Sequence, residues 1–215
     1  MELFREHVYG TAPESDYATT SCAMSHEVLS SEVALGGLAT RREIKLRLDG
    51  PSGASQEWVV LLYLPASASG GEPVPCFLGL NFGGNHTVHA DPGITESVVV
   101  EANFAGKPRG GAAERWQVEK VVSRGMALAT VYSGEVEPDD PETAFSHGVH
   151  RLFSGYEAES WGTVAAVRPS RLFHASWRLT DMLAVRMGAV RVCFAVGVGA
   201  QPHAGPAWHG GPRGG

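Results

Sequence analysis

The sequence predicts an α/β fold in which an antiparallel meander leads into parallel strands. Two patterns support this prediction. Three segments with strand character follow one another near the N-terminus and are separated by short glycine turns, and a strand–helix–strand pattern comes after them. The chain has 215 residues, of which 43% are apolar and 19% are charged. This length and composition fit one folded globular domain, and no Gly-X-Y repeat indicates a collagen.

The meander consists of short segments in which apolar and polar residues alternate. In the middle segment Ile44, Leu46 and Leu48 alternate with charged residues, so we expect a strand with one face in water. A short helix is expected before the meander, over residues 2–9. The three predicted strands are Glu27–Ala34, Arg41–Leu48 and Glu57–Leu64.

The next part of the chain has the pattern of a parallel strand pair. Val74–Leu80 is an apolar run without alternation, which predicts a strand buried on both faces. Ala112–Arg124 has the spacing of a helix that ends at Gly125, and Met126–Tyr132 is a second buried strand. A strand–helix–strand connection of this kind joins parallel strands.

The remaining sequence predicts a polar loop, a helix and another strand. The loop covers residues 133–160, the helix residues 176–186, and the strand Val190–Gly197. A meander followed by strand–helix units is the order of an α/β-hydrolase sheet. We therefore expect the N-terminal portion of such a sheet, incomplete at the C-terminus.

Charge is distributed unevenly along the chain. Residues 1–166 hold 22 of the 23 acidic residues, whereas residues 167–215 hold six arginines, one acid and no lysine. The second part could be a basic interaction tail. Its Gly-, Pro- and Arg-rich composition without lysine better fits a GC-rich gene translated in a shifted frame. The net charge of −6 argues against a nucleic-acid partner.

Three cysteines and the absence of long apolar runs narrow the class further. An odd, sparse set of cysteines predicts neither a disulfide framework nor a zinc site. The sequence contains no run of about 18 apolar residues, so it predicts no membrane span. Residues 1–7 do not resemble a signal peptide. As written, the sequence predicts a cytoplasmic chain, and it does not indicate an oligomeric state.

The first candidate site is the loop that follows the predicted strand Val74–Leu80. Two adjacent glycines let backbone N–H groups approach a ligand closely, as in the oxyanion hole of an α/β hydrolase. The alternative is a tight turn that needs a positive φ. The candidate oxyanion-loop or substrate-loop residues are Phe82, Gly83, Gly84, Asn85 and His86.

A second candidate is a metal site formed by His86, His89 and Asp91. These residues lie in a predicted loop, and the two histidines are three residues apart rather than in the i, i+4 helical arrangement of a zinc protease. We therefore favour ordinary polar loop residues, and we predict no metal and no cofactor.

The sequence offers no nucleophile for the hydrolase reaction. An α/β hydrolase needs a Gly-x-Ser-x-Gly turn after the strand Val190–Gly197, but no serine follows Ser176 and no threonine follows Thr180. Cys193 lies inside the predicted strand, where a buried structural thiol is expected. We assign no catalytic residue.

The stretch VPCFLGLNFGGNHT, residues 74–87, is the most specific of a series of motifs that follow one another in order over residues 3–166. These motifs resemble the bacterial glucuronoyl esterases, which are carbohydrate esterases of the α/β-hydrolase superfamily related to proteins named acetyl xylan esterases. The family continues with a Gly-x-Ser-Arg-x-Gly turn, an acid and a histidine, and no position here matches them. The matching segments are Leu3–Gly10, Ala34–Arg41, Leu61–Pro65, Val74–Thr87, Arg109–Gly110, Arg115–Trp116, Ser123–Gly125, Ala129–Tyr132, Gly148–His150 and Ser160–Gly162.

The resemblance implies a serine esterase acting on glucuronoyl esters of xylan, the links between lignin and carbohydrate. Its partner would be a plant cell-wall polysaccharide ester, and the family is commonly secreted or periplasmic. We expect residues 1–166 to be the N-terminal part of this domain and residues 167–215 to be a degenerate or frame-shifted segment. The chain would then be truncated and inactive. The alternative is a carbohydrate-binding pseudoenzyme without catalysis.

Overall fold

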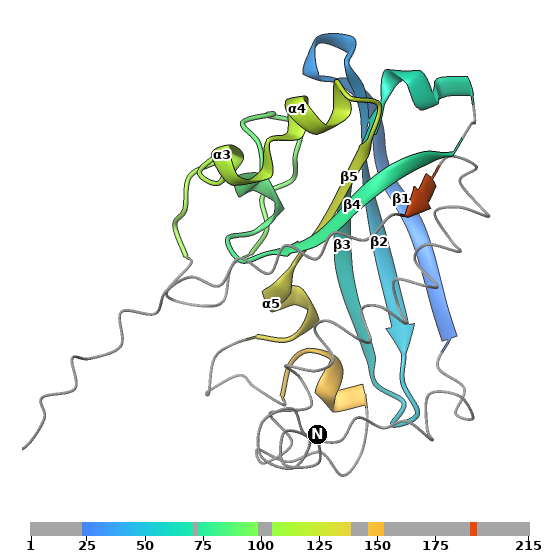
Figure 1. Ribbon diagram of the computed structural model, residues 1–215. Coiled ribbons are helices and arrows are strands. Elements are labelled where there is room, and N and C mark those ends of the chain that lie inside the picture. The colour runs from blue at the N-terminus through green and yellow to red at the C-terminus, as the bar shows by residue number, and fades with distance from the viewer. Residues whose placement is uncertain (1–22, 71–72, 99–104, 139–145, 153–189, 193–215) are drawn as a thin grey trace, which may run out of the picture.

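A computed structural model of the chain describes residues 23–70, 73–98, 105–138, 146–152 and 190–192 (Figure 1). The helices predicted over residues 2–9 and 176–186 lie outside these ranges. One mixed sheet dominates the described part, with the strand order β1-β2-β3-β5-β4-β6. Its strands are β1 Ala23–Ala34, β2 Ala39–Asp49, β3 Ser55–Pro65, β4 Val74–Asn81, β5 Ala127–Tyr132 and β6 Val190–Val192.

The pairing of the strands confirms the predicted α/β fold. Strands β1, β2 and β3 form an antiparallel meander, and β3 is also antiparallel to β5. Strand β4 is parallel to β5 on one side and to β6 on the other. This arrangement is the N-terminal portion of an α/β-hydrolase sheet.

Short helices lie on one side of the sheet and at the strand ends (Figure 1). Helices α3 and α4 lie together beside β4 and β5, and α5 follows the carboxyl end of β5. The α-helices are α3 Ala113–Trp116, α4 Val118–Val122 and α5 Ser133–Val136. The 3-10 turns are η2 Leu35–Gly37, η3 Ala66–Gly70, η4 Asn85–Thr87 and η5 Val149–Leu152.

The core has two parts, one on each face of the sheet, and β3 contributes to both. Val60 and Leu62 pack with residues of β2 and β5 on one face, whereas Leu61 and Tyr63 pack with α4 on the other. All four side chains are fully buried. Alternate residues of a strand point to opposite faces, so a strand covered on both faces is apolar throughout.

The prediction that β4 is buried on both faces is wrong. In β4 only Cys76 and Asn81 are buried, and Phe77 remains 37% exposed. Strand β5 is buried at every position, as predicted, because it lies between β3 and β4. The apolar composition of β4 therefore did not reveal that its cover is incomplete.

The predicted helix over Ala112–Arg124 is broken into α3 and α4. Gln117 separates them and has a left-handed backbone with φ 48°. Trp116 and Val118 both pack into the core beside α4, although residues two apart lie on different faces of a continuous helix. The break lets both side chains reach the same core. Helix α4 ends at Val122, earlier than predicted, and Gly125 ends the turn that follows it with a left-handed φ of 74°.

The segment predicted as a polar loop over residues 133–160 is not polar at its start. Ser133, Gly134 and Val136 are buried in α5, directly after β5. Leu152 of η5 is fully buried as well. These residues pack against β3, so their environment is set by tertiary contacts rather than by local polarity.

Candidate oxyanion loop

The loop Phe82–His86 follows β4 at its carboxyl end, which is where ligands bind in open α/β sheets. Gly84 has φ 90° and ψ 153°, a conformation that favours glycine. A Cβ atom at Gly84 would lie 2.8 Å from Cε1 of His86 and 2.9 Å from Cβ of Ser97. The backbone therefore needs glycine here for both its conformation and its close packing.

Two backbone donors of this loop have no acceptor among the described residues. Asn85 donates its N–H to Oγ of Ser97 at 2.9 Å, and Thr87 donates its N–H to the carbonyl of Gly84 at 3.0 Å. The N–H groups of Gly83 and Gly84 donate to no acceptor in the described part of the chain. Adjacent amides of this kind can bind an anionic oxygen.

A buried pair of asparagines connects the loop to the sheet. Asn81 Nδ2 donates to Oδ1 of Asn85 at 2.7 Å and to Oγ1 of Thr130 at 3.1 Å. Asn85 Nδ2 in turn donates to the carbonyl of Val59 on β3 at 2.9 Å. Asn81 is 2% exposed and Asn85 1% exposed, so these bonds are shielded from water.

The contact with Val59 lies where β3 continues beyond the end of its partner. The pairing between β3 and β5 begins at Val60 and Val131, so the polar groups of Val59 need other partners. Its carbonyl accepts from Asn85, and its N–H donates to Oε2 of Glu135 at 2.8 Å. Burial raises the pKa of the Glu135 carboxyl.

His86 is a structural member of the loop. Its Nδ1 accepts the N–H of Ser97 at 3.3 Å, and its Nε2 lies 3.2 Å from the carbonyl of Lys107. A neutral ring with the proton on Nε2 satisfies both contacts. His86 thereby connects three segments, the loop after β4, Ser97 and Lys107.

The residues of the hypothetical metal site are engaged by separate partners. His89 Nε2 bonds to Oε1 of Glu119 at 3.0 Å, and its Nδ1 accepts the N–H of Asp91. The Asp91 carboxylate binds Arg41 at 2.8 Å. Across the described ranges, no three His, Cys, Asp or Glu side chains are arranged to hold a metal ion.

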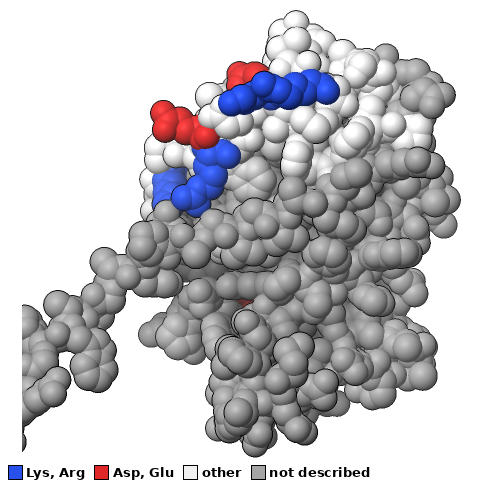
Figure 2. Space-filling model, in the orientation of Figure 1, with Lys and Arg blue, Asp and Glu red and all other residues white. Residues whose placement is uncertain are grey.

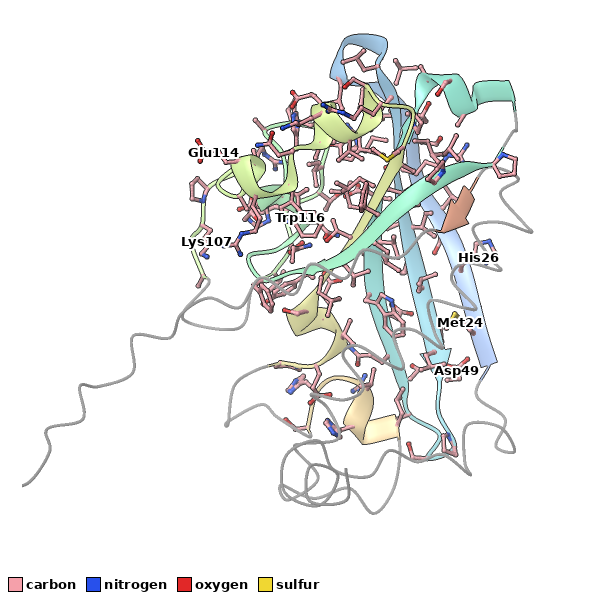
Figure 3. All side chains as sticks on the ribbon, in the orientation of Figure 1. Met24, His26, Asp49, Lys107, Glu114 and Trp116 are labelled. Atoms are coloured by element: carbon pink, nitrogen blue, oxygen red, sulfur yellow. The ribbon has the colours of Figure 1, made fainter. Side chains whose placement is uncertain are left out.

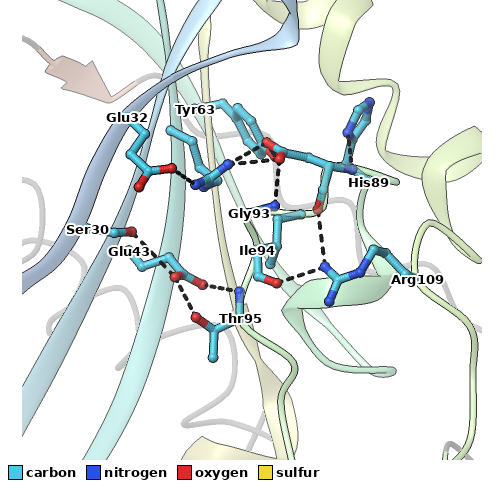
Figure 4. A network of polar contacts seen from close by, with 11 residues as sticks. Ser30, Glu32, Glu43, Tyr63, His89, Gly93, Ile94, Thr95 and Arg109 are labelled. Carbon is cyan, nitrogen blue, oxygen red and sulfur yellow. Dashed lines mark hydrogen bonds and ion pairs between the residues drawn. The ribbon is translucent and has the colours of Figure 1, made fainter.

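Asp91 belongs to a polar network that sequence reasoning missed (Figure 4). Its carboxylate accepts two hydrogen bonds from Arg41, one from the Tyr63 hydroxyl at 2.9 Å and one from the Gly93 N–H at 2.9 Å. Arg41 also binds Glu32 at 2.6 Å. Burial opposes ionisation of Asp91, but these donors together hold its pKa below the usual range.

A second set of contacts holds the same loop a few residues later (Figure 4). Glu43 accepts the N–H of Thr95 at 2.9 Å and its hydroxyl at 2.8 Å, while Arg109 donates to the carbonyls of Asp91 and Ile94. Arg41 and Glu43 are each 3% exposed. The sequence pattern had placed Glu43 on a wet face, and the structure corrects this because residues 91–95 cover that part of β2.

The molecular surface over α3 and α4 carries charges of both signs (Figure 2). Figure 2 shows basic and acidic side chains side by side over the region of α3 and α4. Lys107 and Glu114 lie there near Trp116 (Figure 3), and Lys107 and Glu114 are exposed. Trp116 reaches back to β4, because a Cβ atom at Gly79 would lie 3.0 Å from its ring.

No described cysteine is suited to be a nucleophile. Cys76 is 1% exposed, and burial raises the pKa of its thiol to about 12. A thiol is reactive as the thiolate, so Cys76 is inert at neutral pH. Cys193 lies outside the described residues, and Gly-x-Ser-x-Gly occurs nowhere in the 215-residue sequence.

The mixed sheet and the glycine loop define the N-terminal portion of an α/β hydrolase, and the comparisons with known proteins narrow the class. The chain is 36% identical over 181 residues to a carbohydrate esterase from an unknown prokaryotic organism. That match covers 77% of this chain and 40% of the relative. No family model matches the chain.

Solved structures give the same result. A glucuronoyl esterase from Solibacter usitatus matches 91% of this chain with a TM-score of 0.69 and 34% identity. A promiscuous CE15 esterase from a marine bacterial metagenome matches the same share with a TM-score of 0.64 and 29% identity. The homologues of this chain are therefore carbohydrate esterases of the glucuronoyl esterase family, as its motifs predicted.

The match extends over only part of these proteins. The chain spans 40% of the curated relative and about half of each of the two solved structures, 50% and 49%. Among the described residues, no helix has the length and apolar character needed to cross a membrane.

Proposed function

We propose that this chain carries the oxyanion-binding portion of a serine carboxylic-ester hydrolase that acts on glucuronoyl esters of xylan. One observation carries the proposal. The N–H groups of Gly83 and Gly84 have no acceptor in the described chain and lie in the loop after a parallel strand. This is the position of the oxyanion donors in α/β hydrolases. Glucuronoyl esterases are the similar solved structures, which supports a plant cell-wall polysaccharide ester as the substrate.

The chemistry proposed for the intact site is acyl transfer. A serine hydroxyl attacks the ester carbonyl while a histidine takes its proton, and water then hydrolyses the acyl-enzyme. Negative charge develops on the carbonyl oxygen in both steps. The role proposed for Gly83 and Gly84 is to donate hydrogen bonds to that oxygen, with Phe82, Asn85 and His86 shaping the loop around it.

The chain as given supplies no attacking hydroxyl for this reaction. No serine follows Ser176, although the family's nucleophile lies after the strand that corresponds to β6. We propose that residues 1–166 are esterase sequence and that residues 167–215 are read in a shifted frame. An oxyanion loop alone retains little of the rate enhancement, so the 215-residue chain would not hydrolyse these esters.

Sequencing the encoding locus tests this proposal. We expect a neighbouring frame beyond codon 166 to encode Gly-x-Ser-Arg-x-Gly, followed by an acid and a histidine. The protein translated from the restored frame should hydrolyse glucuronic acid methyl ester. Stop codons in both alternative frames, with no family-like sequence, would contradict the frame-shift proposal.

The second candidate function is carbohydrate binding without catalysis. The intact geometry of the Gly83–Gly84 loop favours it, because a binding site does not require the nucleophile. Binding of a glucuronate by the 215-residue chain, with no family-like sequence in the alternative frames, would support this function over the first.

A further inference from the structure

Asn81 stands at the centre of a hydrogen-bonded chain that crosses the carboxyl end of the sheet. This series of hydrogen bonds runs from Thr130 on β5 through Asn81 on β4 to Asn85 in the loop, and it ends at the carbonyl of Val59 on β3. Buried networks of this kind stabilise one arrangement when their members are satisfied. The loop is thus tied to β5 through Asn81 and to β3 through Asn85.

The orientation of both side-chain amides is fixed by their partners. A backbone carbonyl accepts only, so Asn85 must present Nδ2 to Val59 and its Oδ1 to Asn81. Asn81 must therefore present Nδ2, and its buried Oδ1 has no hydrogen-bond partner in the part of the chain that the structure describes. An unsatisfied buried acceptor is unfavourable, so stability alone does not account for an asparagine at this position.

Gly83 and Gly84 lie between the two asparagines. Asn81 ends β4, and Asn85 is held through its side chain by Asn81 and Val59 and through its N–H by Ser97. We propose that Asn81 is a positioning residue: through its bond to Asn85, it sets the direction of the Gly83 and Gly84 N–H groups. The proposal rests on the oxyanion role given to these amides above.

The substitution Asn81→Asp in the full 215-residue chain tests the proposal, because it replaces the donor without changing the size of the side chain. At neutral pH the new carboxylate faces Oδ1 of Asn85 and has no proton to donate. We expect the protection of the Asn85 amide against hydrogen exchange, measured by NMR, to fall about ten-fold. The NMR signals of the Gly83 and Gly84 amides should shift with it.

Lowering the pH should rescue this variant. A protonated carboxyl can donate to Asn85, so protection should recover as the introduced group takes up its proton. The uncharged variant Asn81→Ser is too short to reach Asn85 and should lose protection without recovery. It also keeps the test valid if the carboxylate variant does not fold.

Thr130→Val is the matched control, since it removes only the longer of the two bonds made by Asn81 Nδ2. We expect normal Asn85 protection in this variant. Unchanged Asn85 protection in both Asn81 variants would overturn the proposal. An equal loss at Asn85 and at the core amides of Leu61 and Leu62 would also overturn it, because that pattern indicates general destabilisation.

A separate titration distinguishes this inference from the proposed function. Glucuronic acid methyl ester added to the unsubstituted chain should shift the Gly83 and Gly84 amide signals. If it does not, the oxyanion role fails, and the proposal for Asn81 fails with it even where the exchange data show that Asn81 orders the loop.

Discussion

Asp91, which we expected to be an ordinary polar loop residue, accepts hydrogen bonds at the centre of a network. Four hydrogen bonds from Arg41, Tyr63 and Gly93 occupy the carboxylate that the disfavoured alternative made a metal ligand. Arg41 is 4% exposed and Asp91 is 10% exposed at the side chain. Removing the Asp91 charge leaves the buried Arg41 paired with Glu32, whose side chain is 64% exposed, so the compensation of its charge is weaker.

We expect Asp91→Asn to destabilise the chain by about 2–4 kcal/mol, measured as the free energy of unfolding in urea. The matched control is Asp49→Asn, whose ion pair with Arg47 has both side chains nearly half exposed. That change should cost less than about 1 kcal/mol. Equal effects of the two substitutions would contradict the role given to the Asp91 network.

The lowered pKa of Asp91 predicts a dependence of stability on pH. An unfolded aspartate has a pKa of about 3.9, so the folded state gains stability from this group above that pH and loses it as the pH falls through the lower folded value. Urea unfolding between pH 7 and pH 3 should show this loss, and the loss should be smaller in Asp91→Asn. An identical pH profile for the two proteins would refute the assignment.

The break between α3 and α4 illustrates how tertiary packing decides an element. Periodicity predicted one helix, but Trp116 and Val118 pack into the same core, and Gln117 adopts φ 48° to allow it. A side chain in a left-handed conformation costs roughly 1 kcal/mol relative to glycine. The sequence gives no local sign of this conformation, because glutamine is a good helix former.

Gln117→Gly should therefore stabilise the chain by up to about 1 kcal/mol. The loss of the hydrogen bond from the Gln117 side chain to the carbonyl of Glu114 reduces this gain. Gly125→Ala should have the opposite sign. Gly125 has φ 74° and only Ser67 within 4 Å of a new Cβ atom, so its cost is conformational. Thermal denaturation of both variants measures the change in stability. A Gln117→Gly variant that is less stable than the parent would contradict the conformational strain assigned to Gln117.

At Val59, where the pairing of β3 with β5 ends, the strand depends on the Glu135 carboxylate of α5. Glu135→Ala leaves the Val59 N–H without its partner and should cost about 1–2 kcal/mol in chemical denaturation. Glu135→Gln keeps an acceptor and removes a charge that burial disfavours, as the raised pKa indicates. We expect the glutamine variant to be as stable as the parent at pH 7, and a loss equal to that of alanine would show that the charge matters.

At the scale of the whole molecule, the meander and the parallel strand pair were predictable and the cover of the sheet was not. Alternation in β2 and the uniformly apolar β5 predicted the meander and the parallel pair, because strand period and burial are local properties of the sequence. The loop Phe82–His86 was found through its two glycines. The contacts of Asn81 with Thr130, of Asn85 with Val59 and of Arg41 with Asp91 join residues far apart in the chain, and no local pattern encodes such contacts.

The described residues thus form the N-terminal portion of an α/β-hydrolase sheet together with its candidate oxyanion loop. The chain spans 50% of the Solibacter usitatus enzyme it resembles. The loop Phe82–His86, held through Asn81 and Ser97, needs no catalytic side chain to form. Because the loop forms without the catalytic residues, one chain can have the loop geometry of the glucuronoyl esterases and still lack turnover, as proposed.

The most direct test is the hydrolysis of glucuronic acid methyl ester by the purified 215-residue protein, with the glucuronoyl esterase of Solibacter usitatus as the positive control. We expect product to form no faster than in buffer, with or without a serine-directed phosphonate. Saturable turnover that the phosphonate abolishes would contradict the account, because it would require a nucleophilic serine within these 215 residues.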